Sequence, residues 1–520
     1  MSVRWLLEHC RNREMDREEA LRRAHASVMP LPTEHESWLS GARQMDEGLF
    51  LGTASSSEGD VVIRLPWGGE FAHWLIQGTT GSGKTVWSTD LLVQLIVRGR
   101  GAGCAAGKGD QYQQLLWHLA ARAYGMARAE RENFRKRIVL VDPFGTHLAP
   151  LNLLATHAGV SPETVAYEVA LVIAESMEGG LSVHIESLLR HLLLLLIEAK
   201  LTLVESVEVL EDVTLRAILV RQSKNPVVKR FFSSENVPEV SRRALVGRLQ
   251  AILLSESVRL SFGADACIDL RGVLDRGDPL LVNLGPGPGV PEELRHLFAG
   301  LVLQHLYQAV FSRGTRRPRG YLFSFDEFHH FAAEGPLARR LGTILASARA
   351  FGFFLMLSHH AFAQIPPNLR EMILSNSDIT ALFRTSGRNA EHLGDFLPRI
   401  GQDGRDETRR DQFEELQRLP DRDLYWYDRR KRHRAIRIRV QDLHEPQEVA
   451  GISTGKLEDF MREEGFDRGG VTVSRTELHR QIEARQRHID ELRRPPVTVS
   501  RPPEGPPRAK RAKGGRANLG

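Results

Sequence analysis

A glycine-rich segment, Gly78 to Thr85, constrains the fold of this chain more than any other feature. Its sequence GTTGSGKT matches the pattern GxxxxGK[ST], and the short apolar run HWLIQ at residues 73–77 stands directly before it. The pattern then continues into a helical stretch at residues 84–97. A buried strand, a loop of this kind and a helix in succession are typical of a phosphate-binding loop. The chain is therefore expected to contain an α/β domain built on a parallel sheet.

The residues of this loop have distinct expected roles. Backbone N–H groups of the glycine-rich part would face phosphate oxygens. The amine of Lys84 would reach the β- and γ-phosphates, and the hydroxyl of Thr85 would bind Mg²⁺. ATP and Mg²⁺ are thus the expected cofactors. The expected nucleotide-binding residues are Gly78, Thr79, Thr80, Gly81, Ser82, Gly83, Lys84 and Thr85. A glycine-rich turn that matches by chance is the alternative, and the flanking strand and helix argue against it.

An acidic pair ends a second apolar run. The sequence YLFSF at residues 321–325 is followed directly by Asp326 and Glu327. An aspartate at the end of a buried strand can hold the hydration shell of Mg²⁺, and the adjacent glutamate can orient and deprotonate an attacking water. A helix-capping acidic pair is the alternative interpretation. The presence of a phosphate-binding loop in the same chain favours the catalytic one.

Alternating strand and helix patterns predict the domain organisation. We expect an α/β core with a parallel sheet and covering helices in two parts, residues 49–155 and 263–450, interrupted by an all-helical insert at residues 156–262. Helical periodicity without a convincing strand distinguishes the insert, and its predicted helices are 165–174, 185–199 and 240–254. In the core the predicted helices are 84–97, 294–311 and 337–350. The predicted strands are 73–77, 137–143, 280–284, 321–325, 353–358 and 379–385, with an edge hairpin at 425–427 and 435–440.

The two ends of the chain differ in composition from the core. Residues 1–48 are polar and are expected to form a helical segment. Residues 451–520 are expected to form a charged helix, at 476–492, and a disordered basic tail. Residues 493–520 contain eight Arg or Lys and one Glu, whereas the whole chain carries a net charge of only +5. The body is therefore nearly neutral, and any DNA-binding surface on it must come from local patches.

Hydropathy and cysteine usage indicate a cytoplasmic protein. A membrane-spanning helix needs about 18 or more apolar residues, and the most apolar run, 192–197, is far shorter. The N-terminal sequence lacks the apolar stretch of a secretory signal. The three cysteines, at positions 10, 104 and 267, are widely spaced, which excludes a disulfide framework and fits a reducing compartment.

These motifs resemble those of the HerA/FtsK superfamily of ring-shaped P-loop ATPases that move DNA. Within it they are most similar to the conjugative coupling proteins of type IV secretion (TraG/TraD-like). The resemblance covers roughly residues 50–450. The resemblance implies a RecA-like fold for the α/β core, and the helical insert is similar to the all-alpha domain of coupling proteins. The motifs that carry the resemblance to this superfamily are HWLIQGTTGSGKT, the KGD at 108–110, and DEFHHF followed by SARAFGFFLMLSHH.

The resemblance implies roles for three further residues. Arg349 matches the family arginine that reaches the nucleotide of a neighbouring subunit, and Arg384 is a second candidate for that role. His360 stands where the family has a sensor glutamine. The alternative for either arginine is a structural pairing with an acid. The chain departs from the family in two other respects, since it shows neither the N-terminal membrane helices common in coupling proteins nor the small β-barrel that often begins HerA helicases.

The function expected on this basis is that of an ATP-hydrolysing homo-oligomeric ring, a hexamer, that binds and translocates DNA. A secretion channel or a nuclease would be its partner. The alternative is a nucleotide-switched oligomeric scaffold that recruits an effector without moving DNA, and a small-molecule kinase fits the helical insert and the acidic pair less well.

Two other groups of residues carry weaker signals. The basic run at 429–434 and the C-terminal tail are candidate DNA contacts, with ordinary solvated charge as the alternative. Two histidine pairs, at 329–330 and 359–360, could in principle bind a metal. No suitably spaced carboxylate or cysteine supports that interpretation.

Overall fold

The computed structural model covers most of the region expected to be folded. The residues it describes are 47–56, 59–156, 160–175, 180–233, 238–286, 291–328, 336–361, 364–387, 393, 409–431 and 435–494. The segment expected at residues 1–48 thus lies almost entirely outside the described residues. The basic tail beyond residue 494 lies outside them as well.

One large sheet organises the α/β core. Its strands are β1 (Leu49–Ser56), β2 (Gly59–Leu65), β3 (Trp74–Gln77), β4 (Gly101–Ala106), β5 (Val139–Val141), β7 (Leu280–Asn283), β8 (Tyr321–Asp326), β9 (Phe353–His359), β10 (Ile379–Phe383), β11 (Asp423–Asp428) and β12 (Ile436–Arg439). Within the described chain they form an eleven-stranded sheet in the order β2-β1-β12-β11-β10-β3-β9-β8-β4-β7-β5. Neighbours from β10 to β5 are parallel, and those from β2 to β10 are antiparallel.

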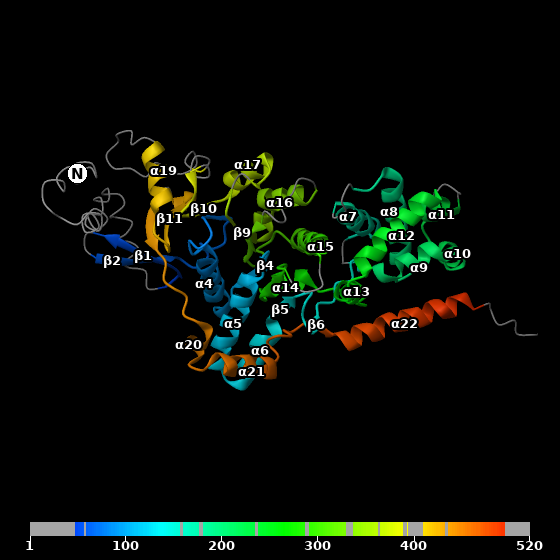
Figure 1. Ribbon diagram of the computed structural model, residues 1–520, viewed down its shortest axis with the longest axis horizontal. Coiled ribbons are helices and arrows are strands. Elements are labelled where there is room, and N and C mark those ends of the chain that lie inside the picture. The colour runs from blue at the N-terminus through cyan, green and yellow to red at the C-terminus, as the bar shows by residue number, and fades with distance from the viewer. Residues whose placement is uncertain are drawn as a thin grey trace, which may run out of the picture.

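Helices cover both faces of the parallel part of this sheet (Figure 1). On one face lie α4 (Lys84–Val97) and α5 (Asp110–Tyr124), and on the other α15 (Glu292–Phe311) and α16 (Pro336–Ser347). Successive residues of a strand point to opposite faces, so Ile76 joins the core that contains α4, whereas Leu75 joins the core that contains α15. The expected RecA-like α/β architecture is therefore confirmed.

Between β5 and β7 the chain forms a helical insert. Its helices are α7 (Pro162–Glu175), α8 (Val183–Glu198), α9 (Ser206–Glu211), α10 (Val213–Gln222), α11 (Pro226–Ser233), α12 (Glu239–Leu253) and α13 (Glu256–Phe262). In the described part of residues 160–262 there is no strand. The two ends of the insert leave the core side by side, because Leu151 forms a β-bridge with Cys267. The domain boundaries at residues 156 and 262 remain our proposal.

Most predicted elements agree with the structure to within a few residues, and α4 has the bounds expected for it. Three differ. The predicted strand 137–143 is shorter, because Arg137 ends the helix α6 (Arg128–Arg137). Strand β4 was not predicted, since its sequence GAGCAA lacks the β-branched and aromatic residues that favour strands. The predicted hairpin forms, but it does not lie at the sheet edge, because β1 pairs with β12 and β2 pairs with β1.

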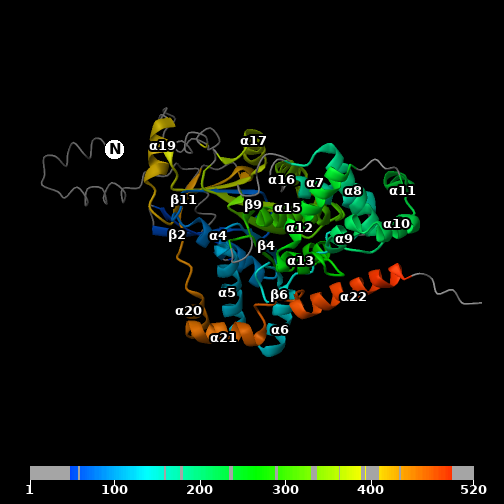
Figure 2. The same cartoon turned by 45° about the vertical axis from the view of Figure 1, so that its right-hand side comes forward.

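A helix near the C-terminus packs along the insert. This helix, α22 (Arg475–Arg493), follows β13 (Val473–Ser474), which pairs with β6 (His147–Leu148) of the core. Figures 1 and 2 both show α22 running beside the insert helices. Its Leu478 and Ile489 are fully buried, and its Arg485 pairs with the buried Glu205 at 3.0 Å. The predicted charged helix therefore exists and packs on the insert.

The last residue of α22 corrects the expected start of the tail. By charge, Arg493 is grouped with the basic tail that is expected to contribute nothing to the core, but its guanidinium pairs with Asp212 at 2.9 Å and with Glu208 at 2.5 Å. This arginine belongs to the folded part of the protein. Across the described ranges, no helix has both the length and the apolar character needed to cross a membrane.

Candidate nucleotide-binding site

The glycine-rich loop and the acidic pair meet at one edge of the sheet. Because β3, β9, β8 and β4 are parallel, their carboxyl ends lie side by side. Gln77 at the end of β3 is in register with His359 of β9, and Asp326 of β8 is in register with Ser358. The loop after β3, the acidic pair after β8 and the residues that follow β9 and β4 are thereby brought together.

Glycine is required at two positions of the loop. Gly83 has a φ of 106°, in the left-handed region that side chains disfavour, and a Cβ on it would lie 2.9 Å from Cδ of Arg422. Gly78 is constrained by space, since a Cβ there would lie 2.6 Å from the Cβ of Phe383. The loop can therefore follow this path against β10 and the residues before β11 only with glycine at both positions.

Hydrogen bonds hold the loop in this shape. The backbone N–H of Thr79 donates to the carbonyl of Arg384 at 2.7 Å, and its hydroxyl donates to the same oxygen at 3.2 Å. The Ser82 hydroxyl donates to the Thr79 carbonyl at 2.8 Å. The loop is thus fastened both to itself and to the end of β10, which organises its N–H groups in advance of binding.

Lys84 is buried inside the curve of the loop. Its Nζ donates to the carbonyls of Gly78, at 2.7 Å, and Thr79, at 3.0 Å, and lies 2.9 Å from Nδ1 of His360. Burial lowers the pKa of Lys84 to about 8, and the nearby carboxylates of Glu327 and Asp326 counter part of that shift. The amine therefore stands where phosphate oxygens would meet it.

Thr85 and Asp326 place two oxygen donors together. The hydroxyl of Thr85 donates to Oδ2 of Asp326 at 3.4 Å. Burial raises the pKa of Asp326, as does the neighbouring charge of Glu327, whereas contacts from Ser358 and Lys84 lower it. A hydroxyl beside a carboxylate at the mouth of a phosphate-binding loop is a donor set that suits Mg²⁺. The residues present therefore fit the metal expected from the sequence.

Glu327 is held tightly in an unusual backbone conformation. Its φ is 55°, a left-handed value that costs a non-glycine residue roughly 1–2 kcal/mol. Its side chain is buried and bonds to Nε2 of His360 and, at 3.1 Å, to Nζ of Lys108. Burial alone would raise the pKa of Glu327, but His360 and Lys108 outweigh it and lower that pKa to about 2. The carboxylate is therefore charged and fixed in direction.

His360 connects the loop lysine with this glutamate. Its Nδ1 faces Nζ of Lys84, and its Nε2 faces the carboxylate of Glu327. With a proton on Nε2 the ring donates to the carboxylate, and an unprotonated Nδ1 accepts from the lysine amine. Nδ1 also lies 3.2 Å from the carbonyl oxygen of Gly78. A glutamine amide could make the same two bonds, which agrees with the position that sequence resemblance gave to His360.

Lys108 is a site residue that was not among those predicted. It stands two residues after the end of β4, and its Nζ lies 3.1 Å from Oε1 of Glu327 and 3.3 Å from Nε2 of His360. The KGD motif was noted at this place in the sequence, but no role for its lysine was inferred. The signal that could have identified it is a lysine at the carboxyl end of a parallel strand, the same edge that carries the loop.

The two candidate arginines lie at opposite edges of the sheet. Arg384 follows β10 on the loop side, where its guanidinium pairs with Asp421 at 2.8 Å. Arg349 precedes β9, in the short helix η3 (Ala348–Phe351), and pairs with Asp378 at 2.9 Å. The structure thus brings Lys84, Thr85, Asp326, Glu327 and His360 together with the loop, and it places Arg349 away from them.

Comparisons with known proteins find similarity at the level of structure. VirB4 of Thermoanaerobacter pseudethanolicus superposes with a TM-score of 0.53 at 11% identity, over 78% of this chain and 99% of that chain. The plasmid coupling protein TrwB in complex with ADP and Mg²⁺ superposes with a TM-score of 0.52 at 13% identity, over 79% and 93%. The bacterial conjugative coupling protein TrwB, in a form bound to sulphate, superposes with a TM-score of 0.51 at 14% identity, over 79% of this chain and 93% of that chain.

The chain has the fold of TrwB and VirB4. No protein-family model matches the sequence, and no curated protein matches it either. At identities this low the likeness establishes the architecture, whereas the activity has to be argued from the site itself.

The histidine pairs do not form a metal site in the described residues. His359 is fully buried at the end of β9, and His329 and His330 lie outside the described residues. Within the described ranges no group of three or more His, Cys, Asp or Glu side chains is arranged to hold a metal ion. In the basic run, Arg429 to Lys431 form the short helix η5, and residues 432–434 lie outside the described part.

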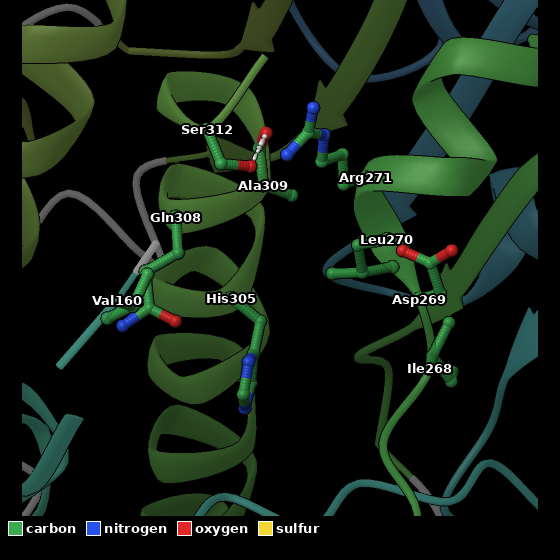
Figure 3. A pocket seen from close by; sticks show the side chains of 9 residues that line it. All are labelled: Val160, Ile268, Asp269, Leu270, Arg271, His305, Gln308, Ala309 and Ser312. Carbon is green, nitrogen blue, oxygen red and sulfur yellow. Dashed lines mark hydrogen bonds between the residues drawn. The ribbon is translucent and has the colours of Figure 1, made fainter. Parts of the chain in front are cut away.

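One described cavity lies away from the nucleotide-binding site. It has a volume of about 120 Å³ and lies between α15 and α14 (Leu270–Arg276). Figure 3 shows His305 and Gln308 of α15 on one side and Asp269 and Arg271 on the other. None of its lining residues belongs to the loop or to the acidic pair, so it is separate from the nucleotide-binding site.

Proposed function

We propose that this chain is a Mg²⁺-dependent ATPase that works as a homo-oligomeric ring, a hexamer, and moves DNA. The observation that carries the ATPase part is the chain of contacts from Lys84 through His360 to Glu327 at the mouth of the glycine-rich loop. It joins a group suited to hold phosphate with a group suited to activate water, both at the carboxyl edge of one sheet.

The proposed division of labour follows from the contacts. The loop N–H groups and Lys84 hold the phosphates of ATP, and Thr85 with Asp326 would hold Mg²⁺, which when bound neutralises charge on those phosphates. Glu327 orients the attacking water and accepts its proton as the water oxygen bonds to the γ-phosphorus and the bond to ADP breaks. His360 and Lys108 fix the direction of the Glu327 carboxylate.

A single chain holds only part of this site. Arg349, which by resemblance completes the site of a neighbour, lies at the opposite edge of the sheet and cannot reach the loop of its own chain. This separation supports an oligomer in which each subunit supplies residues to the next one. The TrwB structure with ADP and Mg²⁺ supports the same choice of cofactors. DNA as the moved polymer, a secretion-channel or nuclease partner, and a cytoplasmic location are our proposals from the resemblance to coupling proteins.

A nucleotide-switched scaffold is the second candidate, and one observation favours it. The Glu327 carboxylate is engaged by both His360 and Lys108. A base held in this way could give slow hydrolysis, which suits a switch that recruits an effector.

The test is ATPase activity of size-fractionated protein with and without DNA. We expect turnover in the oligomeric fraction and faster turnover with DNA. Lys84→Ala should lose nucleotide binding, because it removes a group that contacts phosphate in the ground state. Glu327→Gln should keep binding and lose about 10²–10⁴-fold in rate. Parental turnover in Glu327→Gln would exclude the assigned base, and an oligomer indifferent to every form of DNA would favour the scaffold.

A further inference from the structure

One carboxylate at the edge of the sheet opposite the loop holds two arginines. Asp378 Oδ2 lies 2.9 Å from Arg349 and its Oδ1 lies 3.4 Å from Arg429. The Asp378 side chain is only 9% exposed, whereas those of Arg349 and Arg429 are 49% and 45% exposed. The two guanidinium groups are therefore fixed from the inner side and remain accessible from outside.

Backbone carbonyls orient the same two side chains. Arg349 donates to the carbonyl of Asn376 at 3.2 Å, and Arg429 donates to that of Ser375 at 2.8 Å. Both carbonyls belong to the last turn of α17 (Pro367–Asn376). Since two positive groups share one negative partner, the cluster keeps a net positive charge directed outward.

Sheet topology keeps this cluster away from the loop of its own chain. Asp378 stands directly before β10, whose first residue is in register with Trp74, the first residue of β3. Arg349 precedes β9, and Arg429 follows β11, whose last residue pairs with the start of β10. The glycine-rich loop follows the other end of β3. At about 3.3 Å per residue, a strand of four to seven residues separates the two edges by roughly 13–23 Å.

We propose that Arg349 and Arg429 form a two-arginine clamp that contacts the triphosphate bound to the loop of a neighbouring copy of this chain. The inference rests on the proposed function and extends it, because resemblance suggested only Arg349 and the structure assigns Arg429. Guanidinium groups match phosphate oxygens in geometry and keep their charge at all relevant pH values. With the loop on one edge and the clamp on the other, each subunit has two different surfaces that can bind each other. Such heterologous interfaces between identical subunits can close into a ring.

The same protein contains a matched control for this clamp. Asp278 also holds two arginines, Arg137 at 2.9 Å and Arg276 at 2.6 Å. That pair lies beside β5 and β7, at the far end of the sheet from β3. Arg276→Ala therefore removes one guanidinium from a shared, buried carboxylate without touching the proposed clamp.

The test compares the two alanine variants of the full-length protein. Arg429→Ala should lower turnover at saturating ATP by at least about 10-fold, because an arginine contributed in trans can be worth 10³–10⁵ in rate, and it should keep nucleotide affinity within about twofold. Arg276→Ala should match the parent in both. Arg429→Lys should fall between the alanine variant and the parent, since lysine keeps the charge but not the planar fork.

Mixing subunits tests whether the clamp acts across an interface. Arg429→Ala subunits mixed with Glu327→Gln subunits should regain activity, because some sites then combine an intact Glu327 with an intact Arg429 from the next subunit. Arg429→Ala turnover equal to that of Arg276→Ala, or a mixture that stays inactive, would overturn the clamp. A parent protein without ATPase activity, or one that is always monomeric, would instead overturn the proposed function. Loss of turnover in Arg349→Ala but not in Arg429→Ala would likewise overturn the two-arginine clamp, because Arg429 is the residue that the clamp adds.

Discussion

Nζ of Lys84 lies 2.9 Å from Nδ1 of His360, although 276 positions separate the two residues in the chain. The other ring nitrogen of His360 bonds to Glu327. One imidazole therefore couples the group expected to hold phosphate to the group expected to activate water. A change at the phosphates would reach the Glu327 carboxylate through this ring.

The coupling predicts the behaviour of two His360 variants. His360→Gln should keep turnover within about threefold of the parent, because an amide can accept from Lys84 and donate to Glu327. His360→Leu should lose at least about 10-fold in kcat, since the buried carboxylate and amine both lose a partner. Steady-state kinetics with ATP will distinguish them. Equal turnover of the two variants would show that the ring is not part of the catalytic path.

Variants of Lys108 are expected to change kcat and KM differently. It is expected to position Glu327 rather than to touch ATP, so Lys108→Ala should lower kcat by about 10-fold and leave KM within about twofold. Lys108→Arg should recover part of the loss, because a cation again faces Oε1 of Glu327. A rise in KM with unchanged kcat would contradict the positioning role and would place Lys108 among the ATP-binding groups.

Burial of His73 predicts a dependence of stability on pH. Its side chain is fully buried, and Nδ1 accepts the backbone N–H of Leu355 at 2.9 Å. Burial, with a smaller contribution from Arg349, lowers the pKa of His73 from 6.5 to about 3. The folded state therefore binds fewer protons than the unfolded state between these values, and stability is lost as pH falls through this window. The loss is about 1.4 kcal/mol per pH unit.

The variant His73→Gln isolates this contribution. It can accept the same backbone N–H but does not titrate. We expect it to be less stable than the parent at pH 8, with a Tm difference that narrows as the pH falls from 7 to 5. Burial also lowers the pKa of His118, to about 4. Because His118 is present in both proteins, its contribution to the pH dependence of Tm cancels in the comparison. Parallel Tm curves over this range would argue against a neutral, buried His73.

The contacts of α22 predict the effect of C-terminal truncation. Removing residues 495–520 should leave Tm and basal ATPase activity unchanged, because a segment rich in proline, glycine and basic residues cannot bury a core. Removing residues 475–520 should loosen the helical insert, since Glu205 is buried and would lose Arg485, its ion-pair partner. Leaving a buried charge unpaired typically costs about 3–5 kcal/mol.

Limited proteolysis and thermal unfolding of the two truncated proteins will measure this difference. The shorter protein should be cleaved within residues 160–262 at protease concentrations that spare the other one. Equal protection of the insert in both truncations would mean that α22 does not stabilise it.

The features that depend on contiguous residues could be predicted before the fold was known. The glycine-rich loop, the acidic pair and the apolar strands before them are local patterns, because strand periodicity and loop conformation are set by neighbours in the chain. The α/β class with a helical insert followed from the same patterns. Arg349 and His360 came from resemblance, and that resemblance also carried the expectation of a ring.

The contacts between residues far apart in the chain became visible only in the folded protein. Strand order brings Lys108 to Glu327 and places β12 inside the sheet, and it gathers Arg349 and Arg429 around Asp378. The burial that fixes the pKa of His73 and the ion pairs that dock α22 also depend on segments far apart in sequence. No local pattern encodes these contacts, because strand order and side-chain pairing result from the packing of the whole core.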